Sequence, residues 1–153
     1  MKTLPKVLLG LGGCALLAVL VAAGGVWWFW DRYGTTIVEG GRVAIEEGKK
    51  EGADLDEAGC LAAAVERHRA EGKADLASSI RNTVRLRGCL ETSRLTDDFC
   101  QEAPAEHEVV RAAMWVSGRC TSLGFTDPYC SSLFQRIPEY CASPERRAKV
   151  ERP

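Results

Sequence analysis

The sequence lacks the local cysteine motifs of metal and redox sites. It contains seven cysteines, yet no two of them are separated by two residues. This absence excludes the Cys-x-x-Cys arrangement of zinc knuckles, thioredoxin-type redox pairs and c-type haem attachment. Histidine is scarce as well, since only His68 and His107 occur, each in a charged helical stretch where a solvated side chain is expected. We therefore expect no metal, no cofactor and no catalytic residue.

The chain also lacks an excess of charge and any strand-like alternation. Its 20 Lys and Arg residues nearly balance its 21 Asp and Glu residues, so charge does not indicate a nucleic-acid partner. No stretch alternates apolar and polar residues with the two-residue period of a strand. We predict an all-α fold that comprises an N-terminal transmembrane helix, a short stalk and a disulfide-stapled bundle of about four helices.

A long uncharged run follows the short N-terminal segment 1–6. Residues 7–30 contain no charged side chain, and a helix of this length crosses a hydrocarbon core of about 30 Å. The run predicts a single membrane span with segment 1–6 in the cytoplasm. Aromatic residues that settle at the headgroup level lie at its end, namely Trp27, Trp28, Trp30 and Tyr33. Small residues at every fourth position predict a helix-packing face, namely Gly10, Cys14, Ala18 and Ala22.

Two alternatives to the span remain. The run is also compatible with a signal peptide cleaved after Ala23, which leaves an exposed aromatic N-terminus. A lipoprotein modified at Cys14 is the other alternative, although the apolar run continues well beyond that cysteine. The retained span explains the whole run and is the preferred interpretation.

Beyond Cys14, the remaining cysteines are even in number and well spaced. After a membrane span, this pattern is typical of a disulfide framework in an oxidising compartment, here the bacterial periplasm. We therefore predict an inner-membrane protein whose C-terminal domain lies in the periplasm. A reduced cytosolic domain with free thiols is the alternative. The predicted disulfide residues are Cys60, Cys89, Cys100, Cys120, Cys130 and Cys141.

Helix length restricts how these cysteines pair. Helices are expected between Cys100 and Cys120 and between Cys130 and Cys141, and they hold those pairs beyond the reach of a bridge. Among the remaining pairings, two sets of bonds are favoured, and both contain Cys120–Cys130. Repeat symmetry favours the first set, which adds Cys89–Cys100 and Cys60–Cys141. Antiparallel hairpins favour the second set, which adds Cys60–Cys89 and Cys100–Cys141.

The rest of the chain divides into a stalk, a helical domain and a tail. Residues 31–53 form a glycine-rich stalk in which Gly40, Ala44, Gly48 and Gly52 predict a small-residue seam on a partial helix. Residues 54–142 form a Cys-rich helical domain, with Asp54 as the first helix cap and Gly88 and Gly118 as helix ends. Residues 143–153 predict a disordered charged tail. The residues expected to form buried stripes are Leu55, Ala58, Leu61, Ala62, Val65, Leu76, Ile80, Val84, Val109, Val110, Ala113 and Met114.

A hexapeptide occurs twice in similar form. LTDDFC stands at residues 95–100 and FTDPYC at residues 125–130. In both, a threonine precedes an acid, so Thr96 and Thr126 predict N-caps of two helices, with each final cysteine facing inward. The repeat therefore indicates architecture rather than catalysis.

Charge is divided unevenly along the domain. Seven basic and four acidic residues lie between Val65 and Leu95, whereas the segment from Thr96 to Glu108 holds five acids and neither Lys nor Arg. We expect these two faces to attract each other within the domain. Trp115 lies beside an apolar stripe, where a half-exposed contact residue is expected.

These patterns indicate a binding role rather than catalysis. We expect a non-catalytic accessory or scaffold subunit of an envelope assembly that is anchored by one span and contacts a protein partner in the membrane or periplasm. Two alternatives remain open, namely a thiol-redox or other enzyme that uses an unpaired cysteine, and a secreted inhibitor-like module after signal cleavage.

Overall fold

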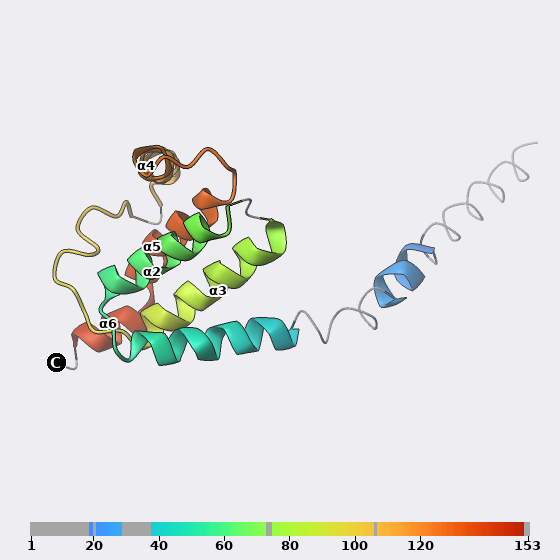
Figure 1. Cartoon of the computed structure of the whole chain (residues 1–153), viewed down its shortest axis with the longest axis horizontal. Coiled ribbons are helices and arrows are strands. Elements are labelled where there is room, and N and C mark those ends of the chain that lie inside the picture. Colours follow the sequence, from blue (N-terminus) through green and yellow to red (C-terminus); the bar gives the residue numbers. More distant parts are fainter. Residues whose placement is uncertain (1–18, 20, 29–37, 73–74, 106, 152–153) are drawn as a thin grey trace, which may run out of the picture. The chain divides into compact units, whose positions relative to one another are not determined.

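A computed structural model describes residues 19, 21–28, 38–72, 75–105 and 107–151 (Figure 1). The chain divides into two compact units, residues 1–39 and 40–153. In the first unit, residues 21–28 are helical and expose Ala22, Trp27 and Trp28. No helix within the described residues is both long and apolar enough to cross a membrane. Most of the predicted span 7–30 lies outside the described residues, together with Gly10, Cys14, Ala18, Trp30 and Tyr33.

The described part of the second unit is all-α, as predicted. It contains no strand, and its only β feature is an isolated bridge between Asp56 and Arg94. A helix over residues 38–52 precedes the labelled helices. These are α2 (Glu57–Ala70), α3 (Leu76–Thr92), α4 (Val109–Ser122), α5 (Cys130–Ala142) and α6 (Pro144–Val150).

Helix α2 begins two residues later than Asp54 predicted. The isolated bridge fixes the preceding backbone, because the Glu57 N–H donates to the Arg94 carbonyl at 3.0 Å. Asp56 then caps the helix, its carboxylate accepting from the Gly59 N–H at 2.7 Å. The helix ends before Gly72, whose φ of 63° suits a residue without a Cβ.

The buried faces of the helices are rotated relative to the predicted apolar stripes. Leu76 and Ile80 are 62% and 54% exposed, whereas Ser79, Asn82 and Thr83 of the same helix are buried. The Asn82 side-chain amide donates to the carbonyl of Ala64 at 2.8 Å, so α2 and α3 meet through small and hydrogen-bonded side chains. The hydrophobic core comprises Cys60, Ala64, Val65, Leu86, Cys89, Leu90, Val116, Cys130, Leu133, Phe134 and Ile137.

The predicted small-residue seam packs helix 38–52 against α3, so residues 40–52 are not a stalk. Ala44, Gly48 and Gly52 are buried, while Gly40 is exposed. A Cβ on Gly48 would overlap the Arg85 carbonyl oxygen and lie 2.9 Å from the Cys89 amide nitrogen. Two helix backbones are therefore in direct contact here, which only residues of minimal size permit.

Glycine is also required on the α3 side of this seam. The sequence predicts Gly88 as a helix end in a left-handed conformation, but it lies inside α3 without positive φ. A Cβ at Gly88 would lie 3.0 Å from the Ile45 carbonyl carbon. Gly118 likewise does not end its helix, since α4 continues to Ser122 and the residue with positive φ is Gly124.

Ion pairs border the seam. Glu51 accepts from Arg67 at 2.7 Å and from Arg85 at 3.0 Å, and Arg85 also pairs with Glu47 at 2.8 Å. Burial raises the pKa of Glu51, but the bonds and charges of Arg85 and Arg67 outweigh this effect and lower it. These arginines thus neutralise helix 38–52 and not the acidic 96–108 segment, contrary to prediction.

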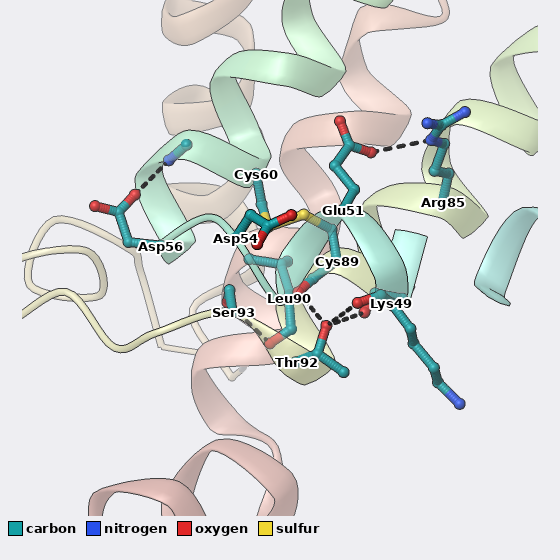
Figure 2. Close-up of a disulfide and its surroundings, with 12 residues drawn as sticks. Lys49, Glu51, Asp54, Asp56, Cys60, Arg85, Cys89, Leu90, Thr92 and Ser93 are labelled. Carbon is teal, nitrogen blue, oxygen red and sulfur yellow. Dashed lines mark hydrogen bonds and ion pairs between the residues drawn. A yellow bond between two sulfur atoms is a disulfide. The ribbon is translucent and has the colours of Figure 1, made fainter. Parts of the chain in front are cut away.

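The three disulfides of the described residues follow the antiparallel-hairpin set. Cys120–Cys130 is common to both predicted sets and is present. The repeat-symmetric pairs Cys89–Cys100 and Cys60–Cys141 are wrong, because the observed bonds join Cys60 to Cys89 and Cys100 to Cys141. Figure 2 shows the Cys60–Cys89 bond beside the seam, with Glu51 bonded to Arg85 and the Thr92 hydroxyl donating to the Lys49 carbonyl.

The predicted disordered tail contains a docked helix. Ser143 caps α6 by accepting from the Arg146 N–H at 3.2 Å. The Arg146 guanidinium donates to the fully buried Glu57 carboxylate at 2.8 and 3.3 Å. That carboxylate also accepts from the Thr96 N–H at 2.9 Å. A buried charge needs such a set of partners, and these bonds therefore hold α6 on the domain.

Neither threonine of the repeated hexapeptide caps a helix. Residues 97–101 form turns only, and the buried Thr96 hydroxyl has no hydrogen-bond partner among the described residues. In the second copy, Asp127 performs the capping, because its carboxylate accepts from the N–H groups of Tyr129 at 2.9 Å and Cys130 at 3.1 Å. The cysteines do face inward, since Cys130 is fully buried and Cys100 half-buried.

We predict that Gly48→Val lowers the free energy of unfolding by about 3 kcal/mol, because the side chain overlaps the α3 backbone. The matched control is Gly40→Ala, at a position where an added Cβ would have no atom within 4 Å and where helix propensity favours alanine. Urea unfolding followed by circular dichroism measures both. Equal stability of the Gly48→Val variant and the wild type would contradict the seam.

We also predict that proteolysis without reduction yields three linked peptide pairs, which mass spectrometry identifies. They should contain Cys60–Cys89, Cys100–Cys141 and Cys120–Cys130. Recovery of Cys60 linked to Cys141 would show that the chain adopts the repeat-symmetric arrangement instead.

Candidate functional site

Helix α4 lies at the periphery of the helical domain (Figure 1). Among the described helices, it packs substantially only against α5. The Cys120–Cys130 disulfide fixes its C-terminal end. Its one buried residue is Val116, and the Trp115 ring meets Phe134 edge-on with 6.0 Å between centroids. Helix α4 is therefore held along one side only.

The most apolar side of α4 faces outward. Val109, Val110 and Met114 are 72%, 74% and 68% exposed, and Ala113 is exposed beside them. The prediction that these residues are buried is wrong, because α4 reaches the core through Val116, its one buried residue. We call Val109, Val110, Ala113 and Met114 the α4 apolar face. A contiguous exposed group of this kind marks an interaction surface more often than scattered single residues do.

A groove runs along each side of α4. The first, of about 630 Å³, lies between α4 and α5, with Val109 and Ala113 on its near wall and Pro138 on its far wall. The second, of about 570 Å³, lies between α4, α2 and the segment that follows α3. Trp115 and Leu61 line this second groove. The α4 apolar face therefore borders the first groove, through Val109 and Ala113, while the second groove lies on the Trp115 side of the helix.

Trp115 is half-buried, as predicted for a contact residue. Its ring lies 5.3 Å from the Arg119 guanidinium carbon, a cation–π distance. Tryptophan and arginine are both enriched at the energetic centres of interfaces. The apolar pattern predicts this exposure correctly, whereas the neighbouring Ala113 and Met114, predicted to be buried, are exposed.

The surface around α4 carries an excess of negative charge. Arg119 pairs with Glu102, and Arg111 pairs with Glu108 at 3.0 Å. A backbone N–H from Ala105 and the Arg111 guanidinium lower the pKa of Glu108. The acids Asp97 and Asp98 are exposed and have no basic partner within the described residues, so their negative charge is left in excess.

The environment of His68 differs most from the sequence-based expectation. A solvated side chain is expected there, but His68 is only 4% exposed and its Nε2 lies 3.0 Å from the Asp127 carboxylate. Its ring also meets Phe125 edge-on at 4.8 Å. No local signal marks this pairing, because the partners are 59 residues apart. His107 is exposed, as expected.

The His68–Asp127 pair has a structural role that the geometry explains. Asp127 caps α5 beside Cys130 and reaches His68 near the end of α2, so one carboxylate joins two helices. Burial raises the pKa of Asp127, but the bonds from His68 and from the Tyr129 and Cys130 N–H groups outweigh it and lower the pKa. The His68 Nε2 is engaged by Asp127, and its Nδ1 is buried without a hydrogen-bond partner within the described residues.

Comparisons with protein-family models, with curated proteins and with solved structures found no match for this chain. Within the described residues, no three His, Cys, Asp or Glu side chains are grouped as a metal site requires. The α4 apolar face and its two grooves are therefore the candidate functional site on geometry alone.

We predict that Asp127→Ala lowers the free energy of unfolding by about 1 to 2 kcal/mol through loss of the α5 cap. Thr126→Ala is the matched control, because Thr126 is exposed and is the cap that the sequence predicts. Urea unfolding at neutral pH compares the two variants. A larger loss of unfolding free energy in Thr126→Ala than in Asp127→Ala would show that threonine is the cap after all.

The pH dependence follows from the lowered pKa of Asp127. Its charged form contributes stability at all pH above the unfolded value of about 3.9, and this contribution is lost as the pH falls through the folded pKa. The difference in stability between wild type and Asp127→Ala should therefore shrink below about pH 4. A constant difference down to about pH 2 would contradict the charge-assisted cap.

Proposed function

We propose that this chain is a membrane-anchored binding or scaffold protein, a non-catalytic accessory subunit of an envelope assembly. Its N-terminal segment anchors it in the inner membrane, and its helical domain lies in the periplasm. The observation that carries the proposal is the outward α4 apolar face, flanked by two grooves. Burying this surface against a protein partner removes apolar area from water, which is the main favourable term in association.

The disulfides support the periplasmic location. Each of the six cysteines in the described part of the chain is paired, and such bonds persist in oxidising compartments. Thiol chemistry needs a free thiolate, so the pairing favours a binding role for this domain. The uncharged run over residues 7–30 supports a single anchoring span.

The shape of the domain suits a docking role. The Cys60–Cys89 disulfide and the seam hold α2, α3 and helix 38–52 together, and Cys100–Cys141 ties α5 to the segment after α3, so α4 is presented on a fixed support. A preorganised surface loses little conformational entropy on binding, which favours affinity. Trp115, half-buried in the wall of the second groove, supplies the aromatic anchor that such interfaces use.

We predict that replacing Val110 and Met114 together by glutamate abolishes complex formation in native membranes. Two buried charges in the centre of an interface should weaken binding by about 30-fold or more, or about 2 kcal/mol. Chemical crosslinking of intact membranes, followed by detection of the tagged chain, measures the shifted species. Circular dichroism should show an unchanged fold, because both side chains are exposed.

Leu76→Glu is the matched control for this experiment. Leu76 is 62% exposed at the start of α3, so the variant adds a charge to an apolar surface position away from α4. It should retain the crosslinked species. Recovery of the wild-type chain only as a free monomer from membranes would contradict the proposed function itself.

A further inference from the structure

Helix α4 depends on one covalent bond for its position. Among the described helices it packs substantially only against α5, and Val116 is its one buried residue. The Cys120–Cys130 disulfide joins its C-terminal part to the first residue of α5. A helix with few buried apolar contacts opens locally at a low free-energy cost. The disulfide therefore contributes much of what holds α4 on the domain.

The chain on either side of α4 is anchored independently of this bond. Before α4, Cys100 is bonded to Cys141 of α5. After α4, the Asp127 carboxylate lies 3.0 Å from the Nε2 of His68, which belongs to α2. Loss of the bond between α4 and α5 therefore frees the residues between these two anchors, chiefly α4, while α2, α3 and α5 keep their contacts with one another.

This bond is also the one that a groove makes accessible. Cys120 is half-buried and lines the first groove, of about 630 Å³, whereas its partner Cys130 is fully buried. A thiolate that enters the groove therefore meets Cys120 first. Cys60 and Cys89 are both fully buried, so their bond is closed to a reductant in the folded domain.

The remaining bond, Cys100–Cys141, is half-buried but reinforced by its neighbours. The rings of Phe99 and Tyr140, each next to one of these cysteines, meet edge-on with 6.4 Å between centroids. Contacts that keep two sulfurs together oppose the separation that reduction requires. Neither cysteine lines one of the two grooves beside α4. We therefore expect Cys100–Cys141 to react more slowly than the bond in the groove.

Loop length makes the loss of Cys120–Cys130 tolerable and reversible. The three disulfides join residues 10, 29 and 41 positions apart, and Cys120–Cys130 closes the shortest loop. In the chain-entropy model the shortest loop contributes least to stability, so the domain stays folded when this bond opens. Two cysteines so close in sequence also meet often, which favours closure of the bond on oxidation.

We propose that Cys120–Cys130 is a redox switch for the α4 apolar face, which a protein dithiol opens. The thiolate of the dithiol attacks the Cys120 sulfur, the S–S bond breaks, and its electron pair leaves on the Cys130 sulfur, which takes up a proton. The second thiolate of the dithiol then attacks its own partner sulfur in the mixed disulfide and frees Cys120, which is protonated. The bond gains two electrons and the dithiol becomes a disulfide. This inference rests on the proposed function and adds its regulation.

The first test uses the full chain in phosphatidylcholine nanodiscs, with a limiting amount of dithiothreitol as the dithiol probe. Free thiols are alkylated over time and located by peptide mass spectrometry. Cys120 and Cys130 should be modified at least about tenfold faster than the other four cysteines of the domain, because access controls the exchange rate. Earlier or simultaneous modification of Cys100 and Cys141 would overturn the inference.

Hydrogen–deuterium exchange then measures the release of α4 in the chain that has lost only this bond. The amides of residues 109–122 should exchange at least about tenfold faster than in the oxidised chain, whereas those of α3 should not change. Unchanged exchange in α4 would show that packing against α5 suffices to hold the helix. Equal acceleration in α3 would show global unfolding. Either result would overturn the inference.

Crosslinking in native membranes connects the switch to the proposed function. Cys120→Ala with Cys130→Ala, studied without reductant, should lower the crosslinked species about tenfold, because a released α4 is no longer preorganised. Full crosslinking by this variant would overturn the switch while leaving α4 as a docking surface. Absence of the species from the oxidised wild type would instead contradict the proposed function. If the variant does not fold, the two tests on the wild-type chain decide.

Discussion

The contact of helix 38–52 with α3 at Cys89 is the constraint on which the rest of the fold depends. On one side of α3, the Cys89 backbone lies against Gly48 and Gly52, where no side chain fits. On the other side, the Cys89 sulfur is bonded to Cys60 of α2. One residue therefore fixes three helices at close range. These helices meet through glycine, alanine and a disulfide. The junction therefore forms without the packing of large apolar side chains.

This arrangement explains why α4 carries its apolar residues outward. The interior is filled by α2, α3 and α5, with Leu86, Leu133 and Ile137 almost fully buried. Helix α4 reaches that interior chiefly through Val116 and Trp115 and is secured by Cys120–Cys130. The crosslink can hold the helix in place without burying its second apolar side. In a small domain, disulfides replace part of the hydrophobic burial that larger domains use, and apolar surface then remains available for a partner.

Sequence reasoning predicted the helical class, the paired cysteines and the bond Cys120–Cys130, because helix periodicity and cysteine spacing are local signals. It failed where a tertiary contact decided the outcome. Apolar periodicity predicts Val110 and Met114 in the core, but it does not state which side of a helix has a neighbour. His68 and Arg146 were expected in solvated segments because their partners, Asp127 and Glu57, are distant in sequence. The four-residue spacing of small residues predicts the seam on helix 38–52. It does not identify Gly88, on the facing side of α3, which the sequence predicts as a helix end.

The methyl group of Met114 provides the most direct test of the central claim, that the apolar face of α4 is free in the isolated chain and covered in the complex. Methionine occurs only at positions 1 and 114, so selective ¹³C-methyl labelling yields two signals at most, and Met114→Leu assigns them. A soluble gadolinium chelate should strongly broaden the Met114 signal in the isolated chain, and association with the protein partner should remove most of that broadening. A Met114 methyl already protected in the isolated chain would contradict the account.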